Sequence, residues 1–303
     1  MSEQAKRRRS HDEAGTLRNA DRARLRYAAG RRVDPTQPRF DADSLTRQIN
    51  RHTVLLLAGG RALLLQIAHP LVAAGVAAHS RFEREPLRRL WRTLDLTLTI
   101  VFGSAAAALR AVRGIERAHA SVQGRLAAAR GPFARGTPYD AGDPRLQFWV
   151  HATLVDSALV AYQRFVAPLS DAALAQFYEE SRTTARLFGI PDDRIPPTYA
   201  DFRAYWRGML RGRALSIGPE SRAIADALLS PALPFGLRHA AGPMRHLTIG
   251  LLPPDIRRRY GYSWQPWQAR TLDAAAFMVR TAAPFFPSLV REFPHARRRR
   301  PVG

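Results

Sequence analysis

His151 is the residue whose type and setting in this sequence best suit chemistry at a metal. The residues at helical spacing after it are apolar or aromatic, namely Leu154, Val155, Ala158, Leu159 and Tyr162. This stripe predicts a helix over Leu146–Phe165 and an imidazole that points into the core. A buried imidazole needs a partner for its nitrogens, and iron is one candidate. A hydrogen bond to a carbonyl or hydroxyl group is the alternative, and the pattern by itself favours that alternative.

Arg89 and Thr93 form a second candidate pair. They are four residues apart, so a helix places both on one face. An arginine and a hydroxyl group on one face suit the binding of a ligand propionate or the orientation of bound oxygen. A solvated helix face with one salt bridge is the alternative.

Two further histidines, His69 and His79, lie close together in the sequence. His79 and Glu83 are four residues apart, which is the spacing of a two-histidine, one-carboxylate iron site or of a simple ion pair. Cysteine is absent, so disulfides, thiolate zinc sites, iron–sulfur clusters and thiolate-bound haem are excluded. Neither a phosphate-binding glycine loop nor the Gly-x-Ser-x-Gly pattern of many hydrolases occurs.

The elements that must position these residues are predicted to be helices throughout. No segment shows sustained alternation of apolar and polar residues, so an all-α fold is expected. Residues 131–144, rich in glycine and proline, are expected to form a loop, and Ser170 is the expected N-cap of its helix. The other predicted helices span 54–68, 71–79, 88–100, 105–119, 171–187, 202–214, 221–229, 236–249, 254–260 and 267–283.

Charge divides the chain into three parts. The formal net charge is +22, and Lys6 is the only lysine among 47 basic residues. Residues 1–40 are expected to be a mostly disordered basic arm, 41–290 a single helical domain, and 291–303 a flexible basic tail. Such a charge attracts anionic lipid or nucleic acid without specificity.

Residues 54–78 are long and apolar enough to raise the question of a membrane span. Arg61, Gln66 and His69 lie within this stretch and Pro70 interrupts it, so a buried core helix is the better interpretation. We expect a cytoplasmic protein with peripheral contact to an anionic membrane surface and no specific nucleic-acid partner.

Several short motifs resemble one protein family. They are RALLLQIAHP from Arg61, GVAAHSRF from Gly75, RLWRT from Arg89, VFG from Val101, WVHATLVDS from Trp149 and RHLTIGLLP from Arg245. In this order they are similar to the domain-of-unknown-function 2236 family, which includes the MpaB-type oxygenase and the latex-clearing rubber oxygenase. The resemblance covers roughly residues 45–285.

The resemblance implies an all-α fold with a globin-like core and a haem b whose iron is held by His151. It places Arg89 and Thr93 beside the haem, and Arg245 is a further haem-binding candidate. Arg92 stands where the rubber oxygenase has a distal lysine. Because guanidinium is a poor iron ligand, the distal side is expected to be open or filled by His69 or His79.

The resulting hypothesis is a haem b-dependent oxygenase that uses dioxygen. Its substrate is expected to be an apolar small molecule, unsaturated or isoprenoid-like, in a pocket formed by residues 54–78 and 93–112. No residue matches the glutamate base proposed for the rubber oxygenase, so rubber itself is not the expected substrate. A non-catalytic haem- or lipid-binding protein is the first alternative. A surface binder of nucleic acid or membrane, acting through its arginine tails, is the second.

Overall fold

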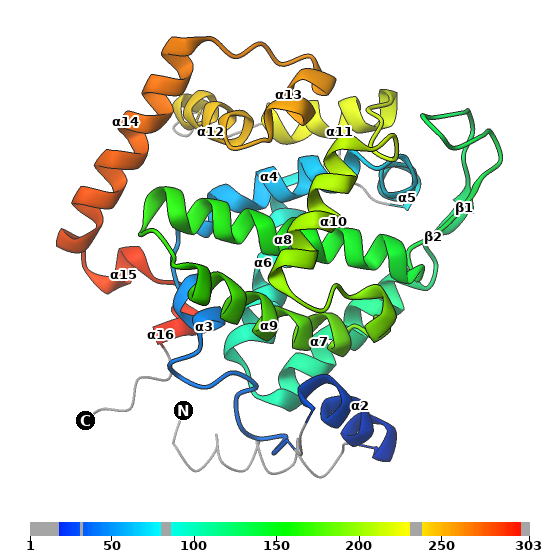
Figure 1. Ribbon diagram of the computed structural model, residues 1–303, viewed down its shortest axis with the longest axis vertical. Coiled ribbons are helices and arrows are strands. Elements are labelled where there is room, and N and C mark those ends of the chain that lie inside the picture. The colour runs from blue at the N-terminus through cyan, green and yellow to red at the C-terminus, as the bar shows by residue number, and fades with distance from the viewer. Residues whose placement is uncertain (1–17, 31–32, 80–85, 231–237, 298–303) are drawn as a thin grey trace.

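The computed structural model describes residues 18–30, 33–79, 86–230 and 238–297, with the backbone alone at 86–90 and 238–240 (Figure 1). The fold is almost entirely helical, which confirms the predicted class. Its helices are α2 (Asn19–Ala29), α3 (Leu45–Asn50), α4 (Leu55–Ile67), α5 (Pro70–His79), α6 (Pro86–Phe102), α7 (Ala105–His119), α8 (Pro144–Phe165), α9 (Asp171–Leu187), α10 (Tyr199–Arg211), α11 (Pro219–Leu229), α12 (Arg238–Gly250), α13 (Pro254–Tyr260), α14 (Pro266–Ala282), α15 (Ser288–Arg291) and α16 (Pro294–Arg297), with 3₁₀ turns η1 (Asp192–Arg194) and η3 (Ala283–Phe285).

The core is centred on α4 and α8, which make the most extensive helix–helix contact in the described residues. In Figure 1 they cross the middle of the molecule, with α9 below them, α12 and α13 above, and α14 along the left side. Leu64 and Leu65 of α4 and Phe148 and Trp149 of α8 are almost completely buried. The Trp149 ring stacks on Trp206 of α10 at a centroid distance of 5.5 Å. These large side chains fix how the two central helices meet.

Local capping signals set several helix boundaries. The Ser170 hydroxyl accepts a hydrogen bond from the Ala173 amide at 3.2 Å, which confirms the predicted N-cap of α9. Asp143 caps α8 by accepting from the Arg145 amide, and Pro144 occupies the first turn, where no amide hydrogen is needed. α8 therefore begins two residues before the predicted start at Leu146.

A sharp bend follows α4. Its axis and that of α5 meet at 106°, and Pro70 is the first residue of α5. Within the described residues, no single helix has both the length and the apolar character to cross a membrane, although α4 and α5 taken together meet that test as a bent pair. Eight residues of α4, including Arg61, are buried.

Several parts of the fold differ from the sequence predictions. The segment predicted as a loop contributes β2 (Pro138–Asp140), which pairs antiparallel with β1 (Gln123–Arg125) in the register Gly124 to Tyr139. Within the predicted basic arm, α2 is a helix whose Leu25 and Ala28 pack into a cluster with α7. The buried Asp21 of α2 pairs with Arg113. Residues 1–17 lie outside the described part.

The chain near the C-terminus packs against the helical body as far as residue 297. Glu292 is buried and pairs with Arg51 at 2.8 Å, and the Phe293 amide donates to the Arg51 carbonyl at 2.9 Å. Phe293 joins the main core. The first residues of the predicted 291–303 tail therefore belong to the folded domain.

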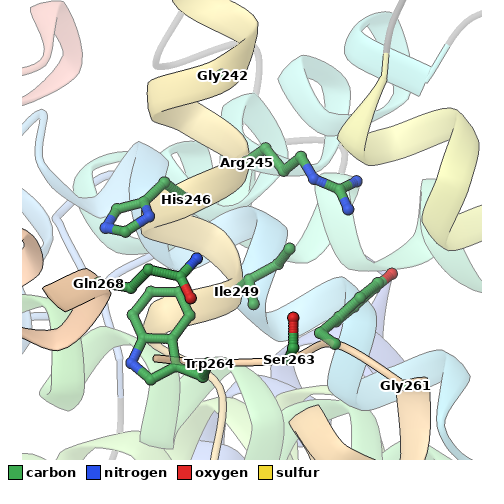
Figure 2. A pocket seen from close by; sticks show the side chains of 9 residues that line it. Gly242, Arg245, His246, Ile249, Gly261, Ser263, Trp264 and Gln268 are labelled. Carbon is green, nitrogen blue, oxygen red and sulfur yellow. The ribbon is translucent and has the colours of Figure 1, made fainter. Parts of the chain in front are cut away.

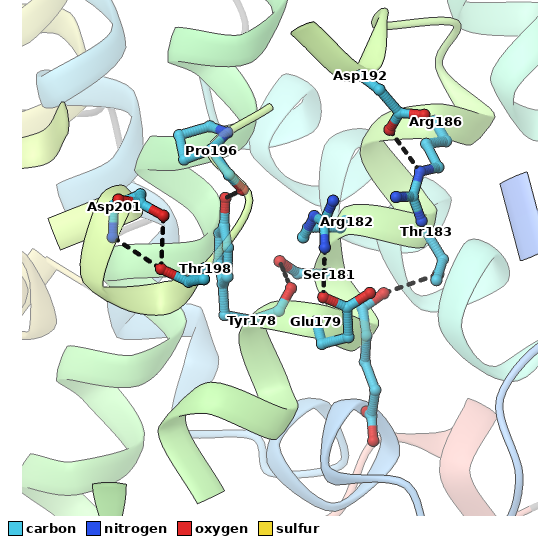
Figure 3. A network of polar contacts seen from close by, with 11 residues as sticks. Tyr178, Glu179, Ser181, Arg182, Thr183, Arg186, Asp192, Pro196, Thr198 and Asp201 are labelled. Carbon is cyan, nitrogen blue, oxygen red and sulfur yellow. Dashed lines mark hydrogen bonds and ion pairs between the residues drawn. The ribbon is translucent and has the colours of Figure 1, made fainter. Parts of the chain in front are cut away.

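Polar contacts around α9 hold the following segment in place (Figure 3). The Tyr178 hydroxyl donates to the Pro196 carbonyl at 2.7 Å, and Arg186 donates to Asp192 in η1 at the same distance. Thr198 then caps α10 by accepting from the Asp201 amide. These contacts position α10, which covers the aromatic side of α8.

Candidate functional site

His151 lies in the second turn of α8, the helix at the centre of the core. Its Nε2 atom is inaccessible to solvent and has no hydrogen-bond partner among the described residues. The nearest aromatic neighbour is Phe148, with ring centroids 6.1 Å apart. Along the predicted stripe, Val155, Ala158 and Leu159 are buried, whereas Leu154, Tyr162 and the His151 residue as a whole are half-buried. A polar nitrogen is thus held in apolar surroundings with its bonding capacity unused.

Burial also sets the protonation state of this imidazole. Desolvation lowers the pKa of His151 to about 4, because the apolar setting penalises the charged form. The ring is therefore neutral at physiological pH, and a neutral imidazole has the lone pair that a metal ligand needs. An unpartnered, neutral, buried nitrogen could hold a haem iron.

The donors that the described residues offer are compatible with a haem iron. Among the described residues, no group of three or more His, Cys, Asp or Glu side chains could hold a metal ion. A porphyrin brings its own nitrogen ligands, so a single protein histidine suffices to hold its iron. The residues present therefore fit the cofactor that the sequence motifs imply.

Polar side chains tie α8 to α4 beside His151. The Gln66 amide of α4 donates to the Thr153 hydroxyl at 3.1 Å, and that hydroxyl donates to the Val150 carbonyl at 2.7 Å. The Trp149 indole lies 3.4 Å from the Gln66 carbonyl oxygen. These bonds fix both the rotation and the height of the His151 turn relative to α4.

A buried ion pair lies one turn further along α8. Arg61 is only 3% exposed and donates to Asp156 and Ser157, at 2.6 Å each, and to the Leu251 carbonyl at 2.7 Å. Arg203 of α10 contacts the second Asp156 oxygen at 3.2 Å. Sequence reasoning noted Arg61 but missed this partnership. A cation inside an apolar run signals a buried carboxylate elsewhere, and Asp156 is the acid within α8.

The structure places His69 and His79 near the β1–β2 hairpin. His69 follows α4, is 6% exposed and lies 5.2 Å from the Phe133 ring. Burial lowers the pKa of His69 to about 4, and its Nδ1 has no partner in the described part of the chain. His79 is exposed and its Nε2 lies 3.2 Å from the Gln123 carbonyl oxygen. No hydrogen bond or ring contact among the described residues joins either histidine to His151. Glu83 lies outside those residues.

Arg89 and Thr93 are both in α6, so their predicted helical spacing is present. The Arg89 side chain lies outside the described residues. Thr93 is exposed, and its carbonyl accepts from the Thr97 hydroxyl at 2.9 Å. Their position relative to His151 stays a prediction.

Arg245 lies in a separate pocket with a volume of about 310 Å³ between α12, α14 and the segment after α13 (Figure 2). Its guanidinium carbon is 5.6 Å from the Tyr262 ring. His246 and Trp264 line the same pocket; their rings stack at 4.8 Å, and the His246 Nε2 lies 2.9 Å from the Thr271 hydroxyl. No contact in the described part links this pocket to His151, and sequence reasoning did not predict it.

Comparison with known proteins supplies the context for this site. Residues 46–281 match the family described as ER-bound oxygenase mpaB/B'/Rubber oxygenase, catalytic domain. The chain is also similar to Uncharacterized protein Mb2261 of Mycobacterium bovis and Uncharacterized protein Rv2237 of Mycobacterium tuberculosis. Each is 28% identical over 232 residues, which cover 74% of this chain and 87% of the relative. No solved structure matches.

The family match spans every helix from α4 to α13 and most of α14, and so contains the whole core around His151. It agrees with the resemblance found in the short motifs, each of which falls inside it. The chain therefore belongs to the family of the ER-bound oxygenase mpaB/B' and rubber oxygenase catalytic domains.

Proposed function

We propose that this oxygenase-family protein is haem b-dependent and that His151 is its proximal iron ligand. The observation that carries the proposal is the Nε2 atom of His151, which is buried and unpartnered within the described residues. Without a ligand, such a nitrogen costs about 1–3 kcal/mol in lost solvation. Its depressed pKa keeps the imidazole neutral and able to donate a lone pair.

The residues of the chain would have distinct tasks in this chemistry. When bound, haem supplies the redox-active iron that dioxygen chemistry requires. His151 holds the cofactor from α8, while Gln66 and Thr153 fix the helix turn that carries it. The buried faces of α4 and α8 exclude water from the His151 side of the site. Arg89 and Thr93 are proposed to bind a propionate or orient oxygen from α6.

The substrate class follows from the same apolar walls. We infer an apolar small molecule, unsaturated or isoprenoid-like, because half-buried aliphatic side chains of α4, α5 and α6, such as Leu63, Val72 and Leu94, pack at the edge of the core. No charged group of α4 other than Arg61 is available for a polar substrate, and Arg61 is fully engaged with its own partners.

Absorption spectroscopy tests the cofactor directly. Protein expressed with haemin should show a Soret band and give the pyridine haemochrome of haem b. His151→Gly should lose both, and added imidazole should restore the band by replacing the missing ligand. His246→Ala, which alters a histidine on another helix, is the matched control and should keep the haem. A colourless wild type, or an unchanged spectrum in His151→Gly, would refute the proposal.

Oxygen uptake tests the activity separately. Reduced holoprotein with squalene, an unsaturated isoprenoid, should consume dioxygen and incorporate heavy oxygen from labelled gas into the product. Haem binding without uptake on any unsaturated hydrocarbon would leave the non-catalytic haem-binding alternative.

A further inference from the structure

An unusual concentration of exposed apolar side chains lies along α14, η3 and α15. We call it the C-terminal apolar edge, and its members are Phe277, Met278, Phe285, Phe286, Leu289 and Val290. Phe285 is 87% exposed, Leu289 70% and Phe277 64%. Single exposed apolar residues are ordinary on protein surfaces, but six within fourteen residues form a patch that requires an explanation.

One face of α14 is already buried against the core. Leu272 and Ala276 are buried and Val279 packs against the main cluster, which accounts for the inward side of the helix. Phe277 and Met278 lie on the outward side of the same helix turn. In Figure 1, α14 and α15 form the outer left edge of the molecule, and no other described element lies beyond them. The edge is thus a surface of the folded domain.

The charge beside the edge is positive. Residues 264–297 contain two acids, Asp273 and Glu292, and ion pairs with Arg164 and Arg51 engage both of them. Arg270 and Arg280 of α14 are exposed. The sequence continues from Arg297 with three further arginines. The edge therefore combines apolar side chains with a positive border.

We propose that the C-terminal apolar edge docks this protein on the surface of an anionic lipid bilayer. Aromatic and aliphatic side chains that enter the headgroup boundary, flanked by arginines that bind lipid phosphates, are the features of interfacial attachment. Each arginine near an anionic surface adds to the attraction. A second copy of this chain is a poor occupant, because both partners carry a net charge of +22.

Vesicle flotation tests the proposal with the full chain. The probes are vesicles of phosphatidylcholine alone and of phosphatidylcholine with phosphatidylglycerol. The wild type should float with the anionic vesicles, less so at high salt, and hardly at all with the neutral ones. Phe285→Ser/Leu289→Ser should weaken binding about tenfold or more, because two large side chains no longer enter the bilayer. Both side chains are exposed, so the fold and the circular dichroism spectrum should be unchanged.

Two further variants make the test specific. Arg270→Gln/Arg280→Gln should reduce binding to anionic vesicles while leaving the weak binding to neutral vesicles unaltered. Tyr27→Ser changes an exposed aromatic residue of α2, on the opposite side of the molecule in Figure 1, and should bind like the wild type.

Three results would overturn the proposal: no flotation of the wild type, flotation unchanged by the Phe285/Leu289 variant, or a wild-type dimer in light scattering that this variant converts to a monomer. The measurement needs neither haem nor turnover, so its failure is separate from any failure of the proposed function.

Discussion

Replacing Arg61 by leucine should test whether the buried ion pair is a structural requirement of the core. In the wild type the guanidinium satisfies three groups at once: the Asp156 carboxylate, the Ser157 hydroxyl and the Leu251 carbonyl. Leucine has a similar apolar volume near the helix but offers no donor. The variant therefore leaves a carboxylate with 4% exposure facing an apolar side chain.

The expected cost can be worked out from this geometry. Removing one partner of a buried ion pair destabilises a protein by about 3–5 kcal/mol, because the other charge stays buried and uncompensated. Arg203 remains 3.2 Å from Asp156 and offsets part of that loss, but its own side chain is 41% exposed, so its attraction is screened. The unpaired hydroxyl and carbonyl add to the cost. We expect a loss of about 3–5 kcal/mol in the free energy of unfolding, a large part of a typical domain's stability.

Urea unfolding followed by circular dichroism measures this loss as a shift in midpoint at constant slope. The double variant Arg61→Leu/Asp156→Leu should be more stable than Arg61→Leu alone, because no buried charge is left unpaired and Arg203 is free to contact water. Asp255→Asn, which breaks the exposed pair with Arg258, is the control and should cost about 1 kcal/mol or less. A loss below about 1 kcal/mol in Arg61→Leu would refute the assigned role of this pair.

Two other predictions concern acid and packing. Burial holds the pKa of His69 at about 4, below its unfolded value of 6.5, so the unfolded chain binds the proton first as the pH falls. The contribution of neutral His69 to the free energy of unfolding is therefore complete above pH 6.5. It is lost as the pH falls towards 4, by about 3 kcal/mol at most. His69→Phe should reduce the slope of the unfolding free energy against pH in that window, because His52 and His151, whose pKa values burial also lowers to about 4, keep their contributions. An unchanged slope would contradict the prediction. Gly60 packs closely on α12, where an added Cβ would lie 2.9 Å from the Thr248 hydroxyl oxygen, so Gly60→Ala should lower the thermal midpoint by the equivalent of about 1–3 kcal/mol. Gly114→Ala in α7, whose Cβ would meet only an arginine tip at 4.0 Å, should raise it, and a fall in both variants would rule out the packing explanation.

The helices that the sequence predicted best are those whose ends carry local signals. α7, α9 and α13 begin and end at the predicted residues, because serine caps or a proline start them and an apolar face extends along each. The prediction was incomplete where long-range contacts decide the structure. α2 has few apolar residues and is held by Arg113, far along the chain, while the strands β1 and β2 are too short to show alternation.

The candidate site was likewise predictable where local patterns define it and not where long-range packing does. Helical spacing around His151 indicated a buried imidazole, and the motif order indicated the family that the match over residues 46–281 confirms. The partners of Arg61 were not predictable, because Asp156 and Leu251 are brought to it only by the packing of α4 against α8 and α12. The pocket at Arg245 was not predictable for the same reason, because it forms only where α14 packs against α12.

The contacts of Arg61 also constrain how the protein can fold during its synthesis. Asp156 follows Arg61 by 95 residues and Leu251 by 190 residues. At a synthesis rate of about 5–20 residues per second, the last partner leaves the ribosome roughly 10–40 s after the arginine. Until then the Nε donor of the guanidinium lacks its final partner, although Asp156 and Ser157 are already present. The contact between α4 and the segment after α12 is therefore a late event in synthesis, and the apolar helix α4 waits for its last partner longer than for Asp156.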